Sequence, residues 1–285
     1  MTDLYHIPGA WSLIYREDGK PDIRRHVSEQ QQHASETDST LPPSHPLRQV
    51  SLGTPELNTL LGGAGIPCGS LTELWGHAGA GKTRIGIQAC IEAVRDGQSA
   101  AVYIDTEGGF SWERWQQWGG GHTPPDALHV YRVWSLAELL AARYVVEEVV
   151  MAARTGTVRL VVLDSVAFPF RAHAAVSPRT LLTFAAQWQR LAYTHNVAVL
   201  MVNHSTIGGE HPGRLRYTPA LGPLWQHVCA HRIYVAPGYA RVTQSALCPE
   251  PDAAPMRPTQ ASLDERSPAH HAAAATPSFR GSLAA

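Results

Sequence analysis

The hydrophobic pattern of the chain changes twice along its length. Between about residues 48 and 248, short apolar segments with little alternation are separated by longer segments in which apolar residues recur at helical spacing. Short apolar runs of this kind are typical of strands in a sheet that is covered on both faces. The candidate strands are residues 71–76, 100–105, 128–133, 159–164, 197–202 and 231–236.

Two of the intervening helices have recognisable start signals. Ser135 is followed three residues later by Glu138, a capping-box pattern ahead of a stretch rich in leucine and valine. Ser177 precedes Pro178, an N-cap residue followed by proline at the first helical position, and predicts a helix that runs toward His195. Strands that alternate with helices predict an α/β fold with a doubly wound, mostly parallel sheet.

The two ends of the chain lack this pattern. Residues 1–47 are polar, with a Ser/Thr/Glu run and few apolar positions, and predict a flexible N-terminal arm. Residues 249–285 are rich in Pro, Ala, Ser and His and predict a disordered tail, because this composition cannot bury a core. Residues 48–248 remain as the predicted globular core.

Composition narrows the class of protein further. The 285 residues are 44% hydrophobic, which is enough for one large α/β core. The formal net charge is −1, so contact with nucleic acid requires local basic loops. The four cysteines stand at wide spacings without a CxxC pair, which favours plain thiols over disulfides or a zinc site. No apolar run approaches the roughly 18 residues of a membrane span, so we expect no membrane partner.

A phosphate-binding motif follows the first core strand. The sequence GHAGAGKT matches G-x-x-x-x-G-K-T and stands directly before a helical stretch, the context that this motif requires. Glycines allow main-chain N–H groups to surround phosphate oxygens, Lys82 neutralises their charge, and the Thr83 hydroxyl is a Mg²⁺ ligand. The motif predicts ATP and Mg²⁺ as cofactors. Its residues are Gly76, His77, Ala78, Gly79, Ala80, Gly81, Lys82 and Thr83.

Two acidic residues at other strand ends complete a candidate ATPase site. The strand at 159–164 ends on Asp164, where an acid would hold the Mg²⁺ shell, although many buried strands end in Asp for structural reasons. Glu107 follows the strand at 100–105 and is the candidate general base that would deprotonate a water. The alternative role for Glu107 is that of a structural, helix-capping acid.

Four segments together resemble a known family. GGAGIPCGSLTELWGHAGAGKT, YIDTEGGF, LVVLDSVAFPFR and PALGPLW resemble the RecA-like core of the eukaryotic recombinase family, Rad fifty-one and its paralogues, over about residues 48–248. The stretch AFPFR is most similar to the C-type paralogue, whereas the pair Asn203–His204 is similar to the D-type paralogue. The resemblance implies a RecA-like P-loop ATPase core.

The resemblance also implies roles for residues outside the phosphate loop. Arg114 occupies the position of the arginine that stacks on adenine in the family, and His204 that of the γ-phosphate sensor. The family's DNA-binding loops correspond to the region that includes Arg171 and to residues 205–221, a glycine-rich segment that we expect to be a mobile loop. Arg171, Arg214 and Arg216 are the candidate DNA contacts, and an ordinary solvated loop is the alternative.

The function implied by the resemblance is recombination mediation. We expect a DNA-dependent ATPase that binds single-stranded or branched DNA in double-strand break repair by homologous recombination, in the nucleus with the cytoplasm as a second location. The alternative is an ATP-gated scaffold with little hydrolysis or direct DNA contact. The first phenylalanine is Phe110, so the Phe-x-x-Ala docking element of the family does not precede the core. We therefore expect a hetero-oligomer with other RecA-like recombinase paralogues.

Overall fold

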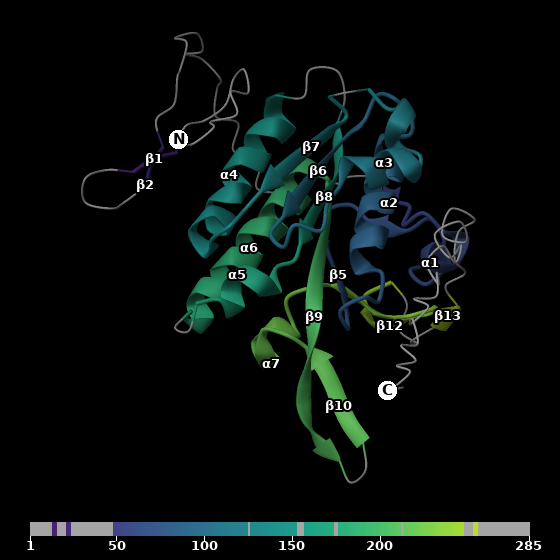
Figure 1. Cartoon of the computed structure of the whole chain (residues 1–285), viewed down its shortest axis with the longest axis vertical. Helices are drawn as coiled ribbons and strands as arrows, with labels where there is room; N and C mark the ends of the chain where they lie inside the picture. The colour runs from purple at the N-terminus through teal and green to yellow at the C-terminus, as the bar shows by residue number, and fades with distance from the viewer. Residues whose placement is uncertain are drawn as a thin grey trace, which may run out of the picture. The chain divides into compact units, whose positions relative to one another are not determined.

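The protein is built on a central sheet that is parallel over most of its width (Figure 1). The computed structural model describes residues 13–15, 21–23, 48–124, 126–152, 157–173, 176–211, 214–247 and 253–255. The strand order is β13-β12-β11-β5-β9-β8-β6-β7, and β10 pairs with β9. The strands are β5 (Leu71–Gly76), β6 (Ala100–Asp105), β7 (Leu128–Arg132), β8 (Val158–Asp164), β9 (Ala198–His211), β10 (Arg214–Pro219), β11 (His231–Ala236), β12 (Tyr239–Ser245) and β13 (Ala253–Pro255).

Strand pairing confirms the predicted doubly wound α/β class. The strands β11, β5, β9, β8, β6 and β7 pair in parallel, and β12, β13 and β10 are antiparallel additions. The strands predicted at 71–76, 100–105 and 231–236 agree with β5, β6 and β11. Because the strands run in parallel, their carboxyl ends meet at one edge, where ligands bind in folds of this class.

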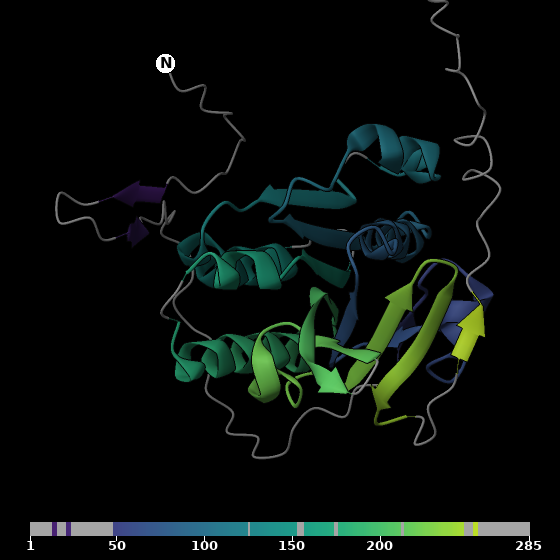
Figure 2. The same cartoon turned by 60° about the horizontal axis from the view of Figure 1, so that its bottom comes forward.

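Helices cover both faces of the sheet (Figure 2). One core packs α2 (Lys82–Val94), α1 (Pro55–Thr59) and the end of α3 (Trp112–Gln117) against one face, together with the short strands β3 (Gln49–Val50) and β4 (Ile66–Pro67). The other core contains α4 (Leu136–Ala152), α5 (Ala167–Arg171), α6 (Pro178–His195) and α7 (Gly222–Trp225). A short 3₁₀ helix, η1 (Gly120–His122), follows α3.

The predicted helix starts are confirmed by their capping hydrogen bonds. The Ser177 hydroxyl accepts a bond of 3.1 Å from the Thr180 amide, with Pro178 at the first helical position of α6. At α4, the Ser135 hydroxyl accepts from the Glu138 amide at 3.2 Å. The Glu138 carboxylate in turn accepts from the Trp134 amide at 2.7 Å, one residue before the Ser135 N-cap. Both helices therefore begin where local side chains satisfy free amides.

Residues 205–211 and 214–219 are the two arms of a β-hairpin, so the loop predicted for this segment is wrong there. Strand β9 continues well beyond the sheet core and pairs antiparallel with β10. Ile207 faces Tyr217 and Thr206 faces Thr218 in this register. β-Branched and aromatic residues at facing positions favour strand pairing and outweigh the glycines of the segment.

Two small elements lie within the segments predicted as arm and tail. Residues Leu13–Tyr15 (β1) pair antiparallel with Pro21–Ile23 (β2), and Ala253–Pro255 adds β13 to the edge of the main sheet. The rest of residues 1–47 and 249–285 lies outside the described residues. Among the helices that the structure describes, none combines the length and apolar character needed to cross a lipid bilayer.

Candidate functional site

The phosphate loop joins the carboxyl end of β5 to the start of α2. Gly79 and Gly81 have φ values of +75° and +94°, in the left-handed region that favours glycine. A Cβ added at Gly76 would lie 2.0 Å from the Val235 carbonyl oxygen, so a larger residue cannot stand there. The glycines at these motif positions therefore shape a loop at a helix N-terminus, the arrangement that binds anions through main-chain amides.

Lys82 is a buried cation held by neutral groups. Its side chain is bonded through Nζ to the carbonyl oxygens of Gly76 at 2.9 Å and His77 at 2.7 Å, and the residue is only 7% exposed. Burial lowers the pKa of Lys82, although the carboxylates of Asp164 and Glu107 act in the opposite direction. A buried ammonium with carbonyl partners fits the negative charge of a bound phosphate, which would offset its burial.

Asp164 meets Thr83 at the end of β8. Its Oδ2 accepts hydrogen bonds from the Thr83 hydroxyl at 2.7 Å and from the Tyr103 hydroxyl at 2.6 Å. Burial raises the pKa of Asp164, and the neighbouring Glu107 and Asp105 raise it further against these hydrogen bonds. A buried carboxylate beside a threonine hydroxyl fits a Mg²⁺ ion, whose charge would favour the ionised acid.

Tyr103 is a site residue that the sequence reasoning missed. It is fully buried in β6, and burial followed by the charge of Asp164 raises its pKa well above the ordinary value. The available signal was a tyrosine in an otherwise apolar strand, because a buried phenol needs a hydrogen-bond partner.

Asp105 organises the loop that follows β6. Its Oδ1 accepts from the amides of Glu107, Gly108 and Gly109 at 3.1, 2.7 and 3.2 Å, and its Oδ2 accepts from the Phe110 amide at 3.0 Å. The Arg132 guanidinium lies 3.2 Å from the same Oδ2. Asp105 therefore holds the loop that carries Glu107.

Glu107 belongs to a cluster of three side chains that the neighbouring strands β6, β8 and β9 bring together. Its carboxylate accepts from the Ser165 hydroxyl and lies 2.6 Å from His204 Nε2, 97 residues away in sequence. His204 Nε2 is also 3.1 Å from the Ser165 hydroxyl. Burial raises the pKa of Glu107, but the hydrogen bonds from His204 and Ser165 and the charges of His204 and Lys82 outweigh it, so the net pKa is lowered.

A second buried network fixes the strand that carries His204. Glu73 is fully buried in β5, and its Oε1 accepts from Asn203 Nδ2 and Trp225 Nε1, both at 2.6 Å. Its Oε2 accepts from Arg232 Nε at 2.6 Å. The Asn203 side-chain oxygen accepts from the His204 amide at 2.7 Å. The Glu73 network thus joins β5, β9, β11 and α7, and it includes Asn203, the neighbour of His204 in β9.

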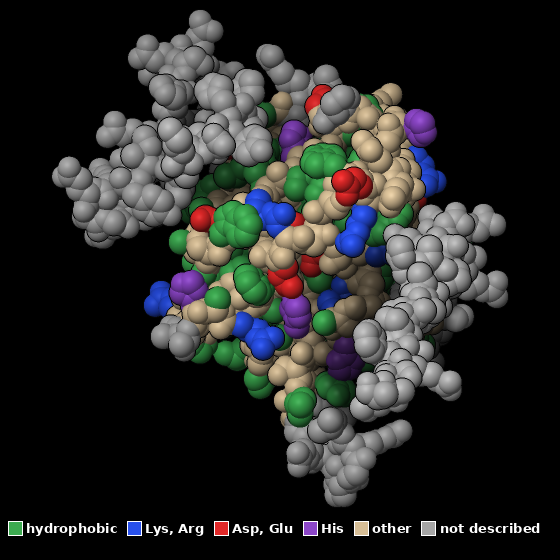
Figure 3. Space-filling model, viewed as in Figure 1, with side chains coloured by type: hydrophobic (Ala, Val, Ile, Leu, Met, Phe, Trp, Pro, Cys, Tyr) green, Lys and Arg blue, Asp and Glu red, His purple; other side chains and the backbone are tan. Residues whose placement is uncertain are grey.

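The remaining predicted residues belong to elements other than the phosphate loop. Arg114 is exposed on α3, and within the described residues no side-chain contact joins it to the loop. Arg171 is exposed at the end of α5, and Arg214 and Arg216 stand at alternate positions of β10. In the space-filling view, acidic and histidine side chains gather near the middle of the viewed face, with basic side chains around them (Figure 3).

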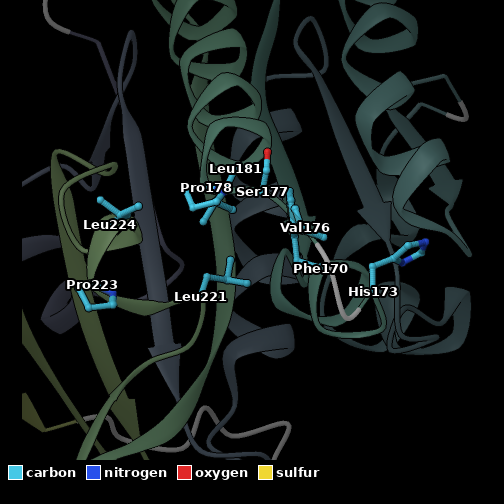
Figure 4. Close-up of a pocket in the computed structure, with 9 residues that line it drawn as sticks. All are labelled: Phe170, His173, Val176, Ser177, Pro178, Leu181, Leu221, Pro223 and Leu224. Carbon is cyan, nitrogen blue, oxygen red and sulfur yellow. The ribbon is translucent and has the colours of Figure 1, made fainter.

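A hollow of about 270 Å³ lies between α5, α6 and α7 (Figure 4). Its lining is mostly apolar and shares no residue with the phosphate loop or the Glu107 cluster. It is lined by Phe170, His173, Val176, Ser177, Pro178, Leu181, Leu221, Pro223 and Leu224.

Comparison with known proteins places this site in a family. Residues 35–210 match the family described as "AAA domain". The DNA repair and recombination protein RadA of Ignicoccus hospitalis is 32% identical over 67% of this chain and 62% of its own length. The DNA repair protein XRCC3 of Bos taurus is 32% identical over 68% of this chain and 64% of its own. The DNA repair protein RAD51 homolog 3 of Dictyostelium discoideum is 25% identical over 62% of this chain and 54% of its own length.

The chain thus spans between about half and two thirds of the length of these curated relatives. The matched residues include the phosphate loop, Glu107, Asp164 and His204, the groups that the fold gathers at one edge of the sheet. The family match, the relatives and the parallel sheet agree: the chain belongs to the AAA domain family, as a RecA-like recombinase relative of the RAD51 paralogue type.

Proposed function

We propose that the chain is an ATP-dependent, DNA-binding recombination mediator that acts in double-strand break repair by homologous recombination. The observation that carries the proposal is the meeting of a P-loop lysine, a Thr83–Asp164 pair and a carboxylate, Glu107, at one sheet edge. The names of the relatives, which describe DNA repair and recombination proteins, support the cellular role.

The proposed chemistry is ATP hydrolysis assisted by the chain's own side chains. Lys82 would leave the loop carbonyls and neutralise the β- and γ-phosphates, while Thr83 and Asp164 would hold Mg²⁺. The bound ion would supply charge neutralisation for the transferred phosphoryl group. Glu107 would orient a water and accept its proton, with His204 and Ser165 holding the carboxylate in place. Arg114 remains a proposed contact to the adenine base.

DNA contact is proposed at the edge of the protein that carries the β9–β10 hairpin. Arg214 and Arg216 lie on this hairpin, whose root is the Asn203–His204 pair beside the phosphate site. Arg171 is exposed at the end of α5, which packs against β9. Arginine side chains bind phosphate groups of any base sequence, so single-stranded or branched DNA is the proposed partner.

A scaffold function is the second candidate, and one observation favours it. The Glu107 carboxylate is bonded by both Ser165 and His204, and its pKa is lowered, which makes it a weaker base. In this case ATP would hold an interface together with little turnover. The partner in both cases is proposed to be another RecA-like paralogue, in the nucleus with the cytoplasm as a second location.

The deciding experiment compares nucleotide binding with turnover. The purified chain is titrated with ATP and Mg²⁺, and phosphate release is then measured with and without a single-stranded oligonucleotide. Turnover that the oligonucleotide raises supports the mediator. Tight ATP binding with no turnover under either condition supports the scaffold, and a chain that binds no ATP contradicts both.

A further inference from the structure

His77 contacts the β9–β10 hairpin through its side chain. Its Nδ1 lies 3.0 Å from the Ser205 hydroxyl, and its ring meets the Tyr217 ring edge-on, with centroids 4.2 Å apart at an angle of 85°. Ser205 belongs to β9 and Tyr217 to β10, so both arms of the hairpin contact one residue of the phosphate loop.

The main chain of the same residue contacts the phosphate-binding lysine. The His77 carbonyl oxygen accepts from Lys82 Nζ at 2.7 Å. Position 77 is a variable position of the G-x-x-x-x-G-K-T motif, so phosphate chemistry does not require histidine there. The side chain is therefore free to serve a purpose other than cradling phosphate.

We propose that His77 is a positioning residue that couples nucleotide in the phosphate loop to the β9–β10 hairpin. The inference rests on the proposed function only in that ATP is the ligand of the loop. A bound phosphate competes with the His77 carbonyl for Lys82 Nζ, so binding changes the bonding of the residue that carries the ring. Because the ring contacts Ser205 and Tyr217, this change in bonding alters the conformation of the hairpin. By reciprocity, the conformation of the hairpin alters the affinity for nucleotide.

The register of the sheet explains why the contact falls on these residues. Gly76 pairs with His204, the last pair of the β5–β9 ladder, so residues 77 and 205 are the first ones beyond the pairing of these two strands. Beyond this point the hairpin is an antiparallel pair attached to the parallel sheet through β9. In the part of the hairpin that the structure describes, Ser205 and Tyr217 thus contact the phosphate loop through His77.

Amide hydrogen exchange of residues 205–219 tests the coupling, with and without ATP and Mg²⁺. In the parent chain we expect ATP to change hairpin exchange by about 5-fold or more, the lower end of typical coupling. At ATP concentrations that saturate each protein, His77→Ala should lose most of this response. Tyr217→Ala, which leaves the loop sequence unchanged, should reduce it as well. His77→Phe keeps the ring contact without the hydrogen bond and should restore part of it.

A nucleotide-free comparison separates this inference from the proposed function. Without ATP, His77→Ala should raise the exchange of hairpin amides selectively, whereas His122→Ala, an exposed histidine after α3, should not. If the parent binds no ATP, the proposed function fails, but the nucleotide-free comparison still tests the contact between His77 and the hairpin. The inference is overturned if hairpin exchange is unchanged by His77→Ala without nucleotide, or if that variant keeps the full parental response to ATP.

Discussion

Asp164 is an acid whose ionised form is disfavoured in the nucleotide-free protein. It is 5% exposed, and its pKa is raised chiefly by burial. A raised folded-state pKa means that stability is greatest when the group is protonated and is lost as pH rises through that pKa. Above this raised pKa the buried charge of Asp164 therefore destabilises the protein when no Mg²⁺ balances it.

We expect Asp164→Asn to stabilise the nucleotide-free protein and to abolish Mg²⁺-dependent ATP binding. The amide oxygen can still accept from Thr83 and Tyr103, but it carries no charge to bury. The melting temperature at pH 7 should rise by about 2–4 °C, the shift produced by roughly 1 kcal/mol in a domain of this size. Thermal unfolding of this variant and of Asp126→Asn, an exposed control, measures it. A lower melting temperature for Asp164→Asn contradicts the argument.

Glu107 presents the opposite case, because its pKa is lowered. We expect Glu107→Gln to retain ATP binding and to lose about 10²- to 10⁴-fold in turnover, since an amide cannot accept the proton of water. Single-turnover phosphate release with saturating ATP measures the loss. Turnover at the parental rate would assign Glu107 a structural role, and a parent without turnover would favour the scaffold.

The same residue makes stability depend on pH in a defined window. A depressed folded-state pKa contributes stability that is present above the ordinary value of 4.5 and is lost as pH falls through the folded pKa. Urea unfolding of the parent and of Glu107→Gln should therefore differ most above pH 4.5 and converge in more acidic solution. A difference that stays constant down to pH 3 would exclude the ionised Glu107–His204 contact as its source.

The sequence could identify residues whose chemistry forms a local motif. Lys82, Thr83 and the strand-ending Asp164 are recognised in this way. Tyr103 and Ser165 are not, because their importance depends on which strands are neighbours and on the register between them. Asp105 pairs with Asp164 across β6 and β8, and no spacing in the sequence encodes that pairing.

At the scale of elements, the β9–β10 hairpin shows where sequence reasoning failed. Glycines and arginines in residues 205–221 predict a mobile loop, but antiparallel pairing satisfies the backbone of most of the segment. The core strands were predictable because continuous apolar character is a local property. Pairing between the two arms of a hairpin depends on cross-strand neighbours, which a pattern along the chain does not reveal.

The hairpin also carries a prediction about DNA. We expect Arg214 and Arg216, changed together to alanine, to weaken single-strand binding and to flatten its salt dependence. Loss of two phosphate contacts should reduce the slope of log affinity against log salt concentration by about 1.4. Fluorescence anisotropy with a labelled oligonucleotide across a salt series measures this. Arg95 and Arg190, exposed on other surfaces, provide a control that removes the same charge. An unchanged slope favours the scaffold function.

At the scale of the whole molecule, the edge of the sheet at β7 is a candidate surface for a partner. Within the described residues β7 pairs only with β6, so its other edge has free main-chain groups that another strand can bind. Trp134 follows this strand and is 73% exposed, a large apolar side chain suited to a partner protein.

Contacts lead from this edge to the phosphate site. The Arg132 guanidinium lies 5.2 Å from the Trp134 ring centroid and 3.2 Å from Asp105 Oδ2. Asp105 in turn binds the amides of the loop that carries Glu107. A partner that binds at Trp134 would therefore contact a series of side chains that ends at Glu107, the proposed catalytic base, so partner and nucleotide can influence each other directly.

We accordingly expect ATP to raise the affinity of this chain for a RecA-like paralogue by about 5-fold or more, and the paralogue to raise ATP affinity by the same factor. Isothermal titration of the two proteins with and without ATP measures both sides of this linkage. Lys82→Ala should remove the ATP dependence while the chain stays folded, because the phosphate cation is lost from an otherwise intact loop.

Trp134→Ala should weaken the pair by about 10-fold, the loss typical of an interface anchor. Met151→Ala, which removes an equally exposed side chain from the far end of α4, should not. Equal affinity with and without ATP in the parent pair would exclude a nucleotide-linked interface, and a Trp134→Ala variant that binds like the parent would place the partner on another face.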